Sequence, residues 1–426
     1  MAYRLLDGVC PQATSLGGDF VKQTHIHAVI IGGGVAGQAL SLFLNKVGIS
    51  PTVFEAYPYT EGIGGGLNVA PNGMNVLDVL GVAEKVKACG TVTLESCFRS
   101  ETGRVLARIN NGGKKYGQPA VSMRRTDLHS VLAEDMQRQD IPITYQKRLN
   151  AVSYTAGKAR VVAHFADGSS ADGDILIGAD GIRSQVRRSV FPVSPEPAYV
   201  GIIGIGGFVP LSAVPKLPER DRQTLNFTFG RRGFFGYSGA RSDEVMWWSN
   251  LWRERELTEE ELRSLSIATV REEMLSIYRG YHEPIEALIS HTGPPVKLNV
   301  YDIQELPPWH DGRVILIGDA AHAVSPNAGQ GASMALEDAM YLAKMLRDTA
   351  GDHERAFEKF ERDRKPRVER IVAEGRRRAS DKQSVTPFHS ALRNLMLAVG
   401  VNLFGERSQD WLYGYRIEWE ARAAAA

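Results

Sequence analysis

The sequence predicts a mixed α/β fold built around a parallel sheet. Three short apolar runs, at residues 27–31, 174–177 and 314–317, each lead directly into a glycine-containing turn. Runs of this length without a polar face are typical of strands that are buried on both sides of a parallel sheet. Residues 200–250 contain aromatic strand segments of a different character, so we expect a second sheet there.

Length and composition are those of a soluble globular protein. The chain has 426 residues, of which 43% are hydrophobic and 23% charged, and its net charge is only +1. This balance gives no electrostatic reason to expect a nucleic acid partner. The cysteines, Cys10, Cys89 and Cys97, have no metal-ligand spacing, so we expect no metal. Neither a signal peptide nor an integral membrane segment is apparent, and we expect a cytoplasmic protein.

The first apolar run is followed by a glycine-rich turn of sequence GGGVAG at residues 32–37. A helix is expected over residues 38–47, and a second strand at residues 52–54 ends in Glu55. This order of strand, turn, helix and strand is the context that a Rossmann-like dinucleotide-binding unit requires. The alternative is a glycine-rich turn that binds no ligand.

Each glycine of this G-x-G-x-x-G pattern has an expected role. Gly32 makes the tight turn, Gly34 lets the backbone approach a pyrophosphate, and Gly37 lets helix and strand pack closely. Glu55 lies 21 residues after Gly34, where an acidic side chain accepts hydrogen bonds from ribose hydroxyls.

A second turn, of sequence GDAAHAVSPNAGQG at residues 318–331, joins the third apolar run to a helix expected over residues 332–346. Asp319 lies at the strand end, where it can accept hydrogen bonds from sugar-like hydroxyls. Residues 329–331 lie at the helix start, where unpaired backbone N–H groups can hold an electron-rich ligand edge. The alternative is an ordinary strand and a capped helix.

Two more segments are candidates for ligand contact. The glycine-rich residues 61–66 form either a close backbone approach to a flat ligand or a flexible loop. Arg125 precedes a helix at residues 127–136, where it contacts a phosphate or ribityl group or else lies on the surface. Residues 151–177 alternate as in a β-meander, and Asp180 follows its last strand.

The aromatic strands suggest the wall of an apolar pocket, although any one aromatic side chain can equally belong to the core. We expect one face of this sheet to turn towards the ligand, with Tyr237 as a polar catalytic group that orients or deprotonates a phenol. The other residues expected on this face are Phe227, Phe229, Phe235, Met246 and Trp248. A helix is expected over residues 258–279, an arginine-rich solvated helix over 354–378, and a docked C-terminal helix over 391–404.

Three motifs in this order, GGGVAG, ADGIRSQVR and GDAAHAVSPNAGQG, resemble those of the single-component flavoprotein monooxygenases related to para-hydroxybenzoate hydroxylase, salicylate hydroxylase and zeaxanthin epoxidase. The resemblance spans residues 26–378. It implies an FAD-binding role for Gly32, Gly34, Val35, Ala36, Gly37, Glu55, Arg125, Asp180, Asp319, Pro326, Gly329, Gln330, Gly331 and Ala332. The same resemblance associates Asp180 with transient NAD(P)H contact.

The resemblance also implies the reaction. Such enzymes use NADPH or NADH and O2 to hydroxylate or epoxidise an aromatic or polycyclic small molecule through a flavin C4a-hydroperoxide. Few side chains need act directly, and Phe227, Phe235 and Trp248 would form substrate walls. The alternatives on the same fold are a flavin reductase or halogenase and a non-catalytic binding protein, but the halogenase segment G-W-x-W-x-I-P is missing.

The expected domain organisation is discontinuous. A Rossmann-like FAD-binding domain comprises residues 26–195 and 301–380, and a substrate-binding β-sheet domain comprises residues 196–300. Residues 60–70 and 91–120 are expected to join the substrate sheet in part. An N-terminal extension at residues 1–25 and a C-terminal helical segment at residues 381–426 complete the chain.

Overall fold

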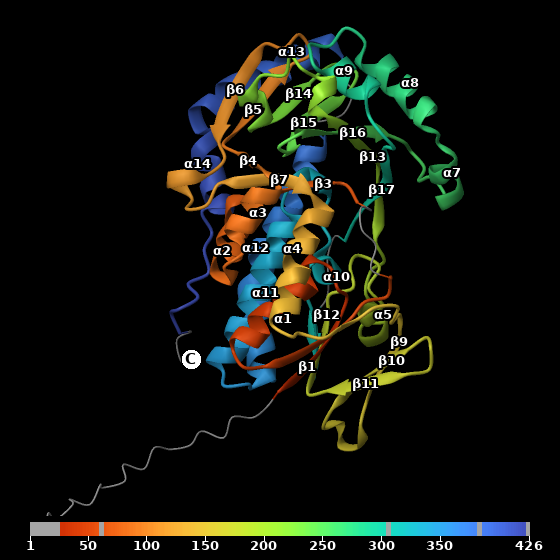
Figure 1. Ribbon diagram of the computed structural model, residues 1–426, viewed down its shortest axis with the longest axis vertical. Coiled ribbons are helices and arrows are strands. Elements are labelled where there is room, and N and C mark those ends of the chain that lie inside the picture. Colours follow the sequence, from red (N-terminus) through yellow and green to blue (C-terminus); the bar gives the residue numbers. More distant parts are fainter. Residues whose placement is uncertain (1–25, 59–63, 304–307, 381–385, 423–426) are drawn as a thin grey trace, which may run out of the picture.

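The computed structural model describes residues 26–58, 64–303, 308–380 and 386–422 (Figure 1). The predicted N-terminal extension and part of the glycine-rich loop at residues 61–66 lie outside the described residues. In the described ranges, no helix is long and apolar enough to cross a membrane.

A six-stranded sheet of order β18-β19-β12-β1-β2-β8 occupies the lower half of the molecule in Figure 1. Its neighbouring strands are parallel, except for β18 and β19. The three predicted apolar strands are adjacent and almost wholly buried, which confirms the parallel sheet. The strands are β1 (His27–Ile31), β2 (Ser50–Phe54), β8 (Ile143–Thr144), β12 (Ile175–Gly178), β18 (His310–Asp311) and β19 (Val314–Leu316).

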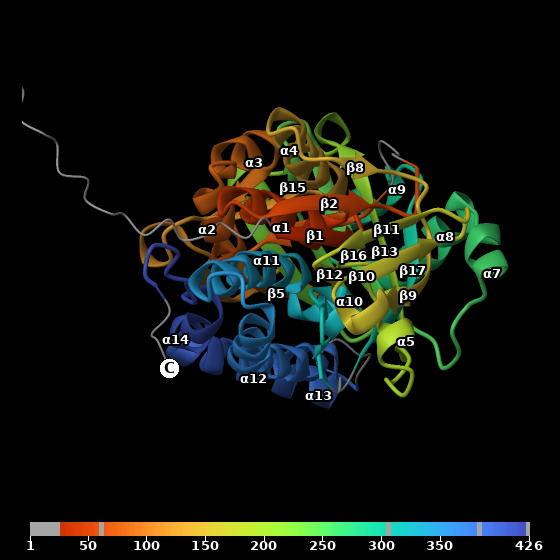
Figure 2. The ribbon, with the colours of Figure 1, turned by 90° about the horizontal axis from the view of Figure 1, so that it is seen from below.

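Helices lie to one side of this sheet and a small antiparallel sheet to the other (Figures 1 and 2). Helix α1 packs against α4 and α11, and α12 packs against α11, whereas β10 and β11 contact β12 and β1. The small sheet is the predicted β-meander, with strands β9 (Leu149–Tyr154), β10 (Val161–Phe165) and β11 (Ser170–Gly173). The helices of this half are α1 (Val35–Lys46), α2 (Pro71–Leu80), α3 (Ala83–Cys89), α4 (Arg125–Arg138), α5 (Gln185–Val190), α10 (Asp319–His322), α11 (Gly331–Asp348) and α12 (His353–Ser380).

A seven-stranded sheet of order β17-β13-β16-β15-β14-β5-β6 occupies the upper half (Figure 1). Its strands are β5 (Glu95–Ser100), β6 (Val105–Asn110), β13 (Ala198–Pro210), β14 (Thr224–Phe229), β15 (Phe234–Arg241), β16 (Glu244–Trp252) and β17 (Val296–Asp302). Helices α6 (Glu219–Arg222), α7 (Glu259–Ser264), α8 (Ile267–Tyr278) and α9 (Ile285–Ser290) accompany it. A second apolar core joins the outer face of this sheet to α8 and α9.

Between the two halves lies a three-stranded sheet of β3 (Gly66–Val69), β7 (Ala120–Arg124) and β4 (Thr91–Thr93). Of the segments expected to join the substrate sheet, only β5 and β6 do so, because β3 and β4 pair with β7 instead. The division of the chain into domains at residues 195 and 300 stays a prediction.

Two predicted helices differ from the structure. The helix expected over residues 258–279 is two helices, α7 and α8, because the Ser266 side chain accepts from the Thr269 N–H and begins a new helix. The C-terminal helix extends beyond residues 391–404: α13 (Pro387–Met396) continues through a π-helical segment (Leu397–Val401) into α14 (Asn402–Tyr413).

Candidate cofactor and substrate site

A single cavity of about 1590 Å³ lies between the carboxyl ends of the central parallel strands and the inner face of the seven-stranded sheet. It is lined by the turns after β1 and β19, by the inner sheet face and by α12 to α14. Its volume exceeds the roughly 300–1,000 Å³ that is typical of a site for one drug-sized ligand. The cavity therefore has room for a large ligand and a smaller one together.

The glycine turn after β1 is shaped by close backbone contacts. Gly32 has a φ of +108°, and a Cβ atom there would lie 2.3 Å from the Ala179 carbonyl oxygen. A Cβ atom on Gly37 would lie 2.0 Å from the Gly32 oxygen, so neither position accepts a side chain. In contrast, a Cβ atom on Gly34 would meet nothing within 4 Å, and Gly34 lines the cavity with Val35 and Ala36.

The first N–H groups of a helix have no intrahelical partners, and α1, which begins at Val35, has no side-chain cap to bind them. They lie beside the cavity and can bind an anion such as a diphosphate. Glu55 directly follows β2 next to this turn, where its carboxylate accepts from the Gly33 N–H at 2.7 Å and from the Tyr57 N–H at 2.9 Å. Arg125, the first residue of α4, lines the cavity as well.

Asp319 follows β19 as the first residue of α10, and its exposed side chain lines the cavity. Burial by the surrounding protein raises the pKa of its carboxyl group, and the nearby His322 and Arg125 side chains partly oppose this rise. A ligand hydroxyl in the cavity could donate a hydrogen bond to this carboxylate.

The second turn ends where α11 starts, at Gly331, as the sequence predicts. Gln330 precedes the helix without capping it, and its Oε1 atom accepts from Asn72 at 2.9 Å. The Gln330 Nε2 atom is buried and has no hydrogen-bond partner among the described residues. Pro326, Gly329, Gln330, Gly331 and Ala332 all line the cavity, and the N–H groups at the start of α11 have no intrahelical partners there.

A buried ionic cluster lies beneath this helix start. Arg364 is fully buried on α12, where its Nη1 atom donates to Glu337 at 2.7 Å and its Nε atom donates to Asp338 at 2.9 Å. Arg367 binds Glu337 from the same helix. The expectation that the arginine-rich residues 354–378 form a solvated face is therefore wrong at these positions, because α12 turns one side onto α11.

The cluster reaches the turn through Asp338. Its Oδ2 atom accepts from the Gly318 N–H at 2.9 Å and lies 2.6 Å from His322 Nε2. Burial alone would raise the pKa of Asp338, but His322, Arg364 and the Gly318 N–H lower it to about 2. The ionised carboxylate thus fixes the strand end that presents Asp319.

Asp180 does not line the cavity, although its neighbours Ala179 and Gly181 do. Its carboxylate accepts from Ser184 Oγ, from the Gln185 N–H at 2.7 Å and from the Val186 N–H at 3.1 Å. Burial raises the pKa of this carboxyl group, and the three donors act against the rise. In this structure Asp180 holds the start of α5, so contact with a cofactor stays a prediction.

The inner face of the seven-stranded sheet forms an aromatic wall. Phe227, Phe229 and Trp248 line the cavity together with Met246. The Phe227 and Trp248 rings meet edge to face with centroids 6.0 Å apart. Gly236 lies between these residues in register, and a Cβ atom there would be 2.3 Å from the Trp248 ring. The glycine therefore makes room for the tryptophan.

Phe235 and Tyr237 lie on the opposite face, so their predicted place in the pocket is wrong. Tyr237 pairs with Asn226, and Phe235 pairs with Thr228. Because Asn226 and Thr228 alternate with the cavity-facing phenylalanines along β14, their partners on β15 point away from the cavity. Both side chains belong to the second core beside α8. Burial raises the pKa of Tyr237 above its usual range, and its hydroxyl does not reach the cavity as a base.

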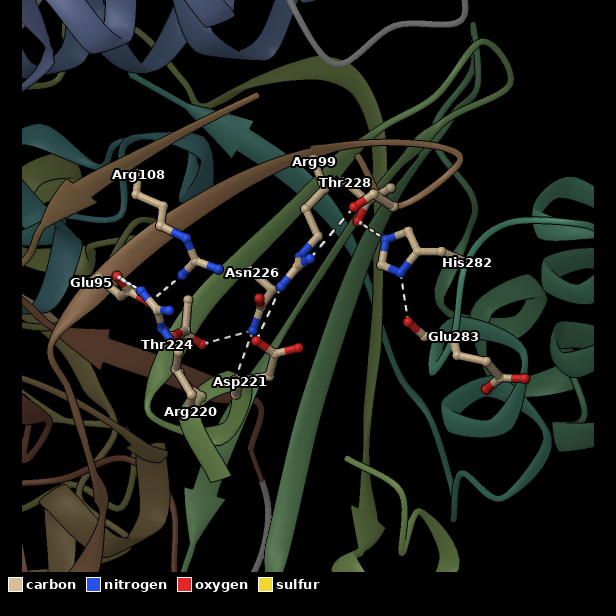
Figure 3. A network of polar contacts seen from close by, with 11 residues as sticks. Glu95, Arg99, Arg108, Arg220, Asp221, Thr224, Asn226, Thr228, His282 and Glu283 are labelled. Carbon is tan, nitrogen blue, oxygen red and sulfur yellow. Dashed lines mark hydrogen bonds and ion pairs between the residues drawn. The ribbon is translucent and has the colours of Figure 1, made fainter. Parts of the chain in front are cut away.

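The outer face near Tyr237 carries a polar network of its own (Figure 3). Arg99 Nη2 pairs with Asp221 at 3.0 Å, and the Asn226 amide donates to the Asp221 carbonyl at 2.7 Å. Thr228 Oγ1 lies 2.8 Å from His282 Nε2, and burial lowers the pKa of this histidine. The sheet thus separates this network from the cavity.

Sequence reasoning missed three residues of the inner face, Ser96, Phe98 and Asn111. Ser96 Oγ donates to Asn111 Oδ1 at 2.9 Å, and the Phe98 and Phe227 ring centroids are 5.5 Å apart. The alternation of Ser96, Phe98 and Ser100 along β5 is a signal that could have indicated a strand, but only the parallel pairing of β5 with β14 places it in this wall.

Comparison with known proteins agrees with this geometry. Residues 25–375 match the family model described as FAD binding domain. The chain is 31% identical over 358 residues to a 6-hydroxynicotinate 3-monooxygenase from Pseudomonas fluorescens, covering 80% of this chain and 88% of the relative. It is 30% identical over 365 residues to a 3-amino-4-hydroxybenzoate 2-monooxygenase from Streptomyces cremeus, covering 84% and 87% of the two chains.

Solved structures share the fold. HpxO from Klebsiella pneumoniae, complexed with FAD and uric acid, superposes with a TM-score of 0.79 at 23% identity and covers 93% of this chain and 99% of its own. A salicylate hydroxylase substrate complex gives a TM-score of 0.76 at 22% identity and covers 95% and 100%. The family match and the two monooxygenase relatives define a flavoprotein oxidoreductase. The chain belongs to the FAD-binding family and is an FAD-dependent monooxygenase that uses NAD(P)H.

Proposed function

We propose that FAD lies along the cavity from the α1 turn to the α11 turn. Three features of the structure support this placement. The uncapped start of α1 suits a diphosphate, Asp319 suits a hydroxyl-bearing linker, and the buried Gln330 Nε2 donor lacks a partner within the described chain. When bound, FAD supplies the oxygen chemistry, with NAD(P)H as reductant and O2 as oxidant.

We further propose that the substrate is a flat aromatic or polycyclic small molecule, which receives one oxygen atom as a hydroxyl or epoxide. The observation that carries this proposal is the aromatic wall of Phe98, Phe227 and Trp248, which faces the amide-lined α11 turn across the cavity. A flat ring held between these surfaces is kept dry and close to the reacting end of the cofactor. The relatives named for hydroxynicotinate and aminohydroxybenzoate support an aromatic substrate.

We propose that the substrate ring is electron-rich because of its own substituents, without deprotonation by the aromatic wall. The cavity-lining residues of β5, β14 and β16 include no Asp, Glu, His, Cys, Tyr, Lys or Arg, and Tyr237 faces away. The aromatic wall therefore positions a ring without offering it a base, because the acidic and phenolic side chains that line the cavity belong to other elements. These side chains are Asp319, Glu374, Tyr301 and Tyr413. We propose that a hydroxyl or amino substituent on the substrate activates the ring. The same proposal places the enzyme in the cytoplasm, acting without nucleic acid, in line with the net charge of +1.

The test is a substrate screen with the purified flavoprotein. Hydroxylated and aminated aromatic acids are supplied with NADH or NADPH in air, and NAD(P)H oxidation is followed together with product mass. A compound of this class should accelerate oxidation and gain one oxygen atom, whereas its analogue without the hydroxyl or amino group should not. Equal turnover of the unsubstituted analogues would contradict the proposed self-activation of the substrate.

A further inference from the structure

One end of the cavity is basic. Among the described residues, five of the six arginines that line the cavity belong to α12, α13 and α14 rather than to the cofactor turns. We call this part of the cavity the basic end and define it by Arg370, Arg377 and Arg378 of α12, Arg393 of α13 and Arg407 of α14. Because the whole chain has a net charge of only +1, this concentration of positive charge is local.

The basic end has one acidic side chain among its described lining residues. Glu374 accepts from Arg377 Nη2 and from Arg378 Nε, each at 2.8 Å. Burial alone would raise the pKa of Glu374, but these two arginines lower it to about 2, so its charge offsets one of theirs. On α14, Asp410 is near Arg407 but lies outside the cavity lining and binds Lys115 at 2.7 Å. The lining side chains of the basic end therefore keep an excess of positive charge.

Two arginines of the basic end are held against aromatic rings. The Arg370 guanidinium carbon lies 3.8 Å from the centroid of the Trp411 ring, and that of Arg393 lies 5.5 Å from the centroid of the Phe229 ring. Such contacts orient a guanidinium without cancelling its charge. Arg393 is only 8% exposed, and its Nη2 atom donates to the Gly230 carbonyl oxygen at 3.1 Å. A charged guanidinium is thus fixed where the aromatic wall ends, in the geometry that suits a carboxylate.

The register of the seven-stranded sheet sets the distance from the basic end to the turn before α11. Phe229 of β14 and Asn250 of β16 lie at the same level on the two strands that flank β15. Two strand spacings place their Cα atoms about 10 Å apart. Asn250 Nδ2 donates to Asn327 Oδ1 at 2.9 Å, so Asn250 marks the position of that turn. The span between the arginine and the turn suits one aromatic ring that carries an acid group.

We propose that the basic end is a subsite for a carboxylate group of the substrate, and that Arg393 orients the substrate ring. The described lining residues of β5, β14 and β16 include no Arg or Lys, so an acid group is bound from the helices and not from the aromatic wall. With its carboxylate at Arg393, the ring turns its opposite side to the turn before α11. The inference rests on the proposed function, which puts the reacting end of the cofactor at that turn.

The test compares the binding of acids and of their uncharged amides to the FAD-loaded protein. The probes are 3-hydroxybenzoate with 3-hydroxybenzamide and 6-hydroxynicotinate with 6-hydroxynicotinamide, and the change in flavin absorbance on titration gives each Kd. An amide matches its acid in shape but lacks the charge. In at least one pair the acid should bind about tenfold more tightly or better at low salt. Added sodium chloride should reduce this advantage, because it screens the charges of the basic end.

Three variants and a control assign the preference to the basic end. Arg393→Gln should weaken binding of the acid about tenfold or more and leave the Kd of the amide within about twofold. Arg393→Lys keeps the charge and should recover part of the loss. Arg407→Gln changes an exposed lining residue and should weaken acid binding about threefold, so it serves if circular dichroism or flavin content shows that Arg393→Gln is misfolded. Arg362→Gln, an exposed arginine of α12 outside the cavity lining, is the matched control.

Several results would overturn the proposal. If neither acid binds more tightly than its amide, or if the folded variants lose acid and amide alike, the basic end is no carboxylate subsite. If Arg393→Gln raises only the KM for NADPH, the basic end serves the phosphate of that co-substrate instead. Oxygenation at the ring carbon that bears the acid group would contradict the orientation. A wrong proposed function would appear differently, as an enzyme that oxidises NAD(P)H with no aromatic compound of either kind, whereas a failed subsite removes only the preference for acids.

Discussion

Replacing Arg364 with methionine should destabilise the protein strongly, because two buried carboxylates would lose their shared partner. Arg364 is 0% exposed, and it binds Glu337 and Asp338, which are 1% and 0% exposed. Methionine fills similar space without a charge. Removing one partner of a fully buried ion pair typically costs about 3–5 kcal/mol, since the remaining charge stays buried. Arg367 still binds Glu337, so the loss should fall mainly on Asp338.

Urea unfolding of the FAD-free protein, followed by tryptophan fluorescence, measures this loss. The matched control is Arg362→Met, on the same helix, whose exposed ion pair with Asp363 should contribute nothing measurable. If Arg364→Met lowered the urea concentration at the unfolding midpoint no more than Arg362→Met does, the buried cluster would not hold the α11 start in place.

The same variant should shift the pH dependence of stability. The pKa of Asp338 is lowered to about 2 from its ordinary value of 3.8, so its ionised form stabilises the fold above that ordinary value. In the wild type this contribution is lost as pH falls towards 2. Without Arg364, burial again raises the pKa of Asp338, and the loss should begin at a higher pH. Acid unfolding curves that coincide for the two proteins would refute this.

Five further substitutions, in three tests, address the site. Asp319→Ala should weaken FAD retention because it removes a carboxylate that faces the cavity, and flavin absorbance unchanged after dialysis would argue against this role. Trp248→Ala should lower the product formed per NAD(P)H consumed. Tyr237→Phe should leave this ratio unchanged, because Tyr237 lies on the face of the sheet away from the cavity. A lower ratio in Tyr237→Phe would restore the hypothesis that Tyr237 acts as a base. Gly37→Ala should disrupt folding, because its Cβ atom would collide with backbone, whereas Gly34→Ala should fold and bind FAD more weakly. Circular dichroism and FAD titration compare the last two, and equal behaviour would contradict the distinct roles.

The local strand and turn patterns determined the class of this protein from its sequence alone. Each apolar run ends in a glycine turn, and the covalent order of strand, turn and helix brings the carboxyl ends of β1, β12 and β19 to one edge. Because that order is local, the glycine turn after β1 and the α11 start near Gly331 were predicted close to their places in the structure, although α1 begins at Val35 rather than at residue 38.

Only the tertiary structure decided which side chains face the cavity. Alternation along β15 shows that Phe235 and Tyr237 share a face, but the sequence does not state which face the register with β14 assigns to them. In the same way, α12 hides Arg364 and leaves Arg362 exposed, although both stand in one arginine-rich run. Whether a side chain is buried depends on which distant segment packs against its face of the strand or helix. A charged or aromatic side chain can lie on the buried or the exposed face, and the local sequence does not distinguish the two.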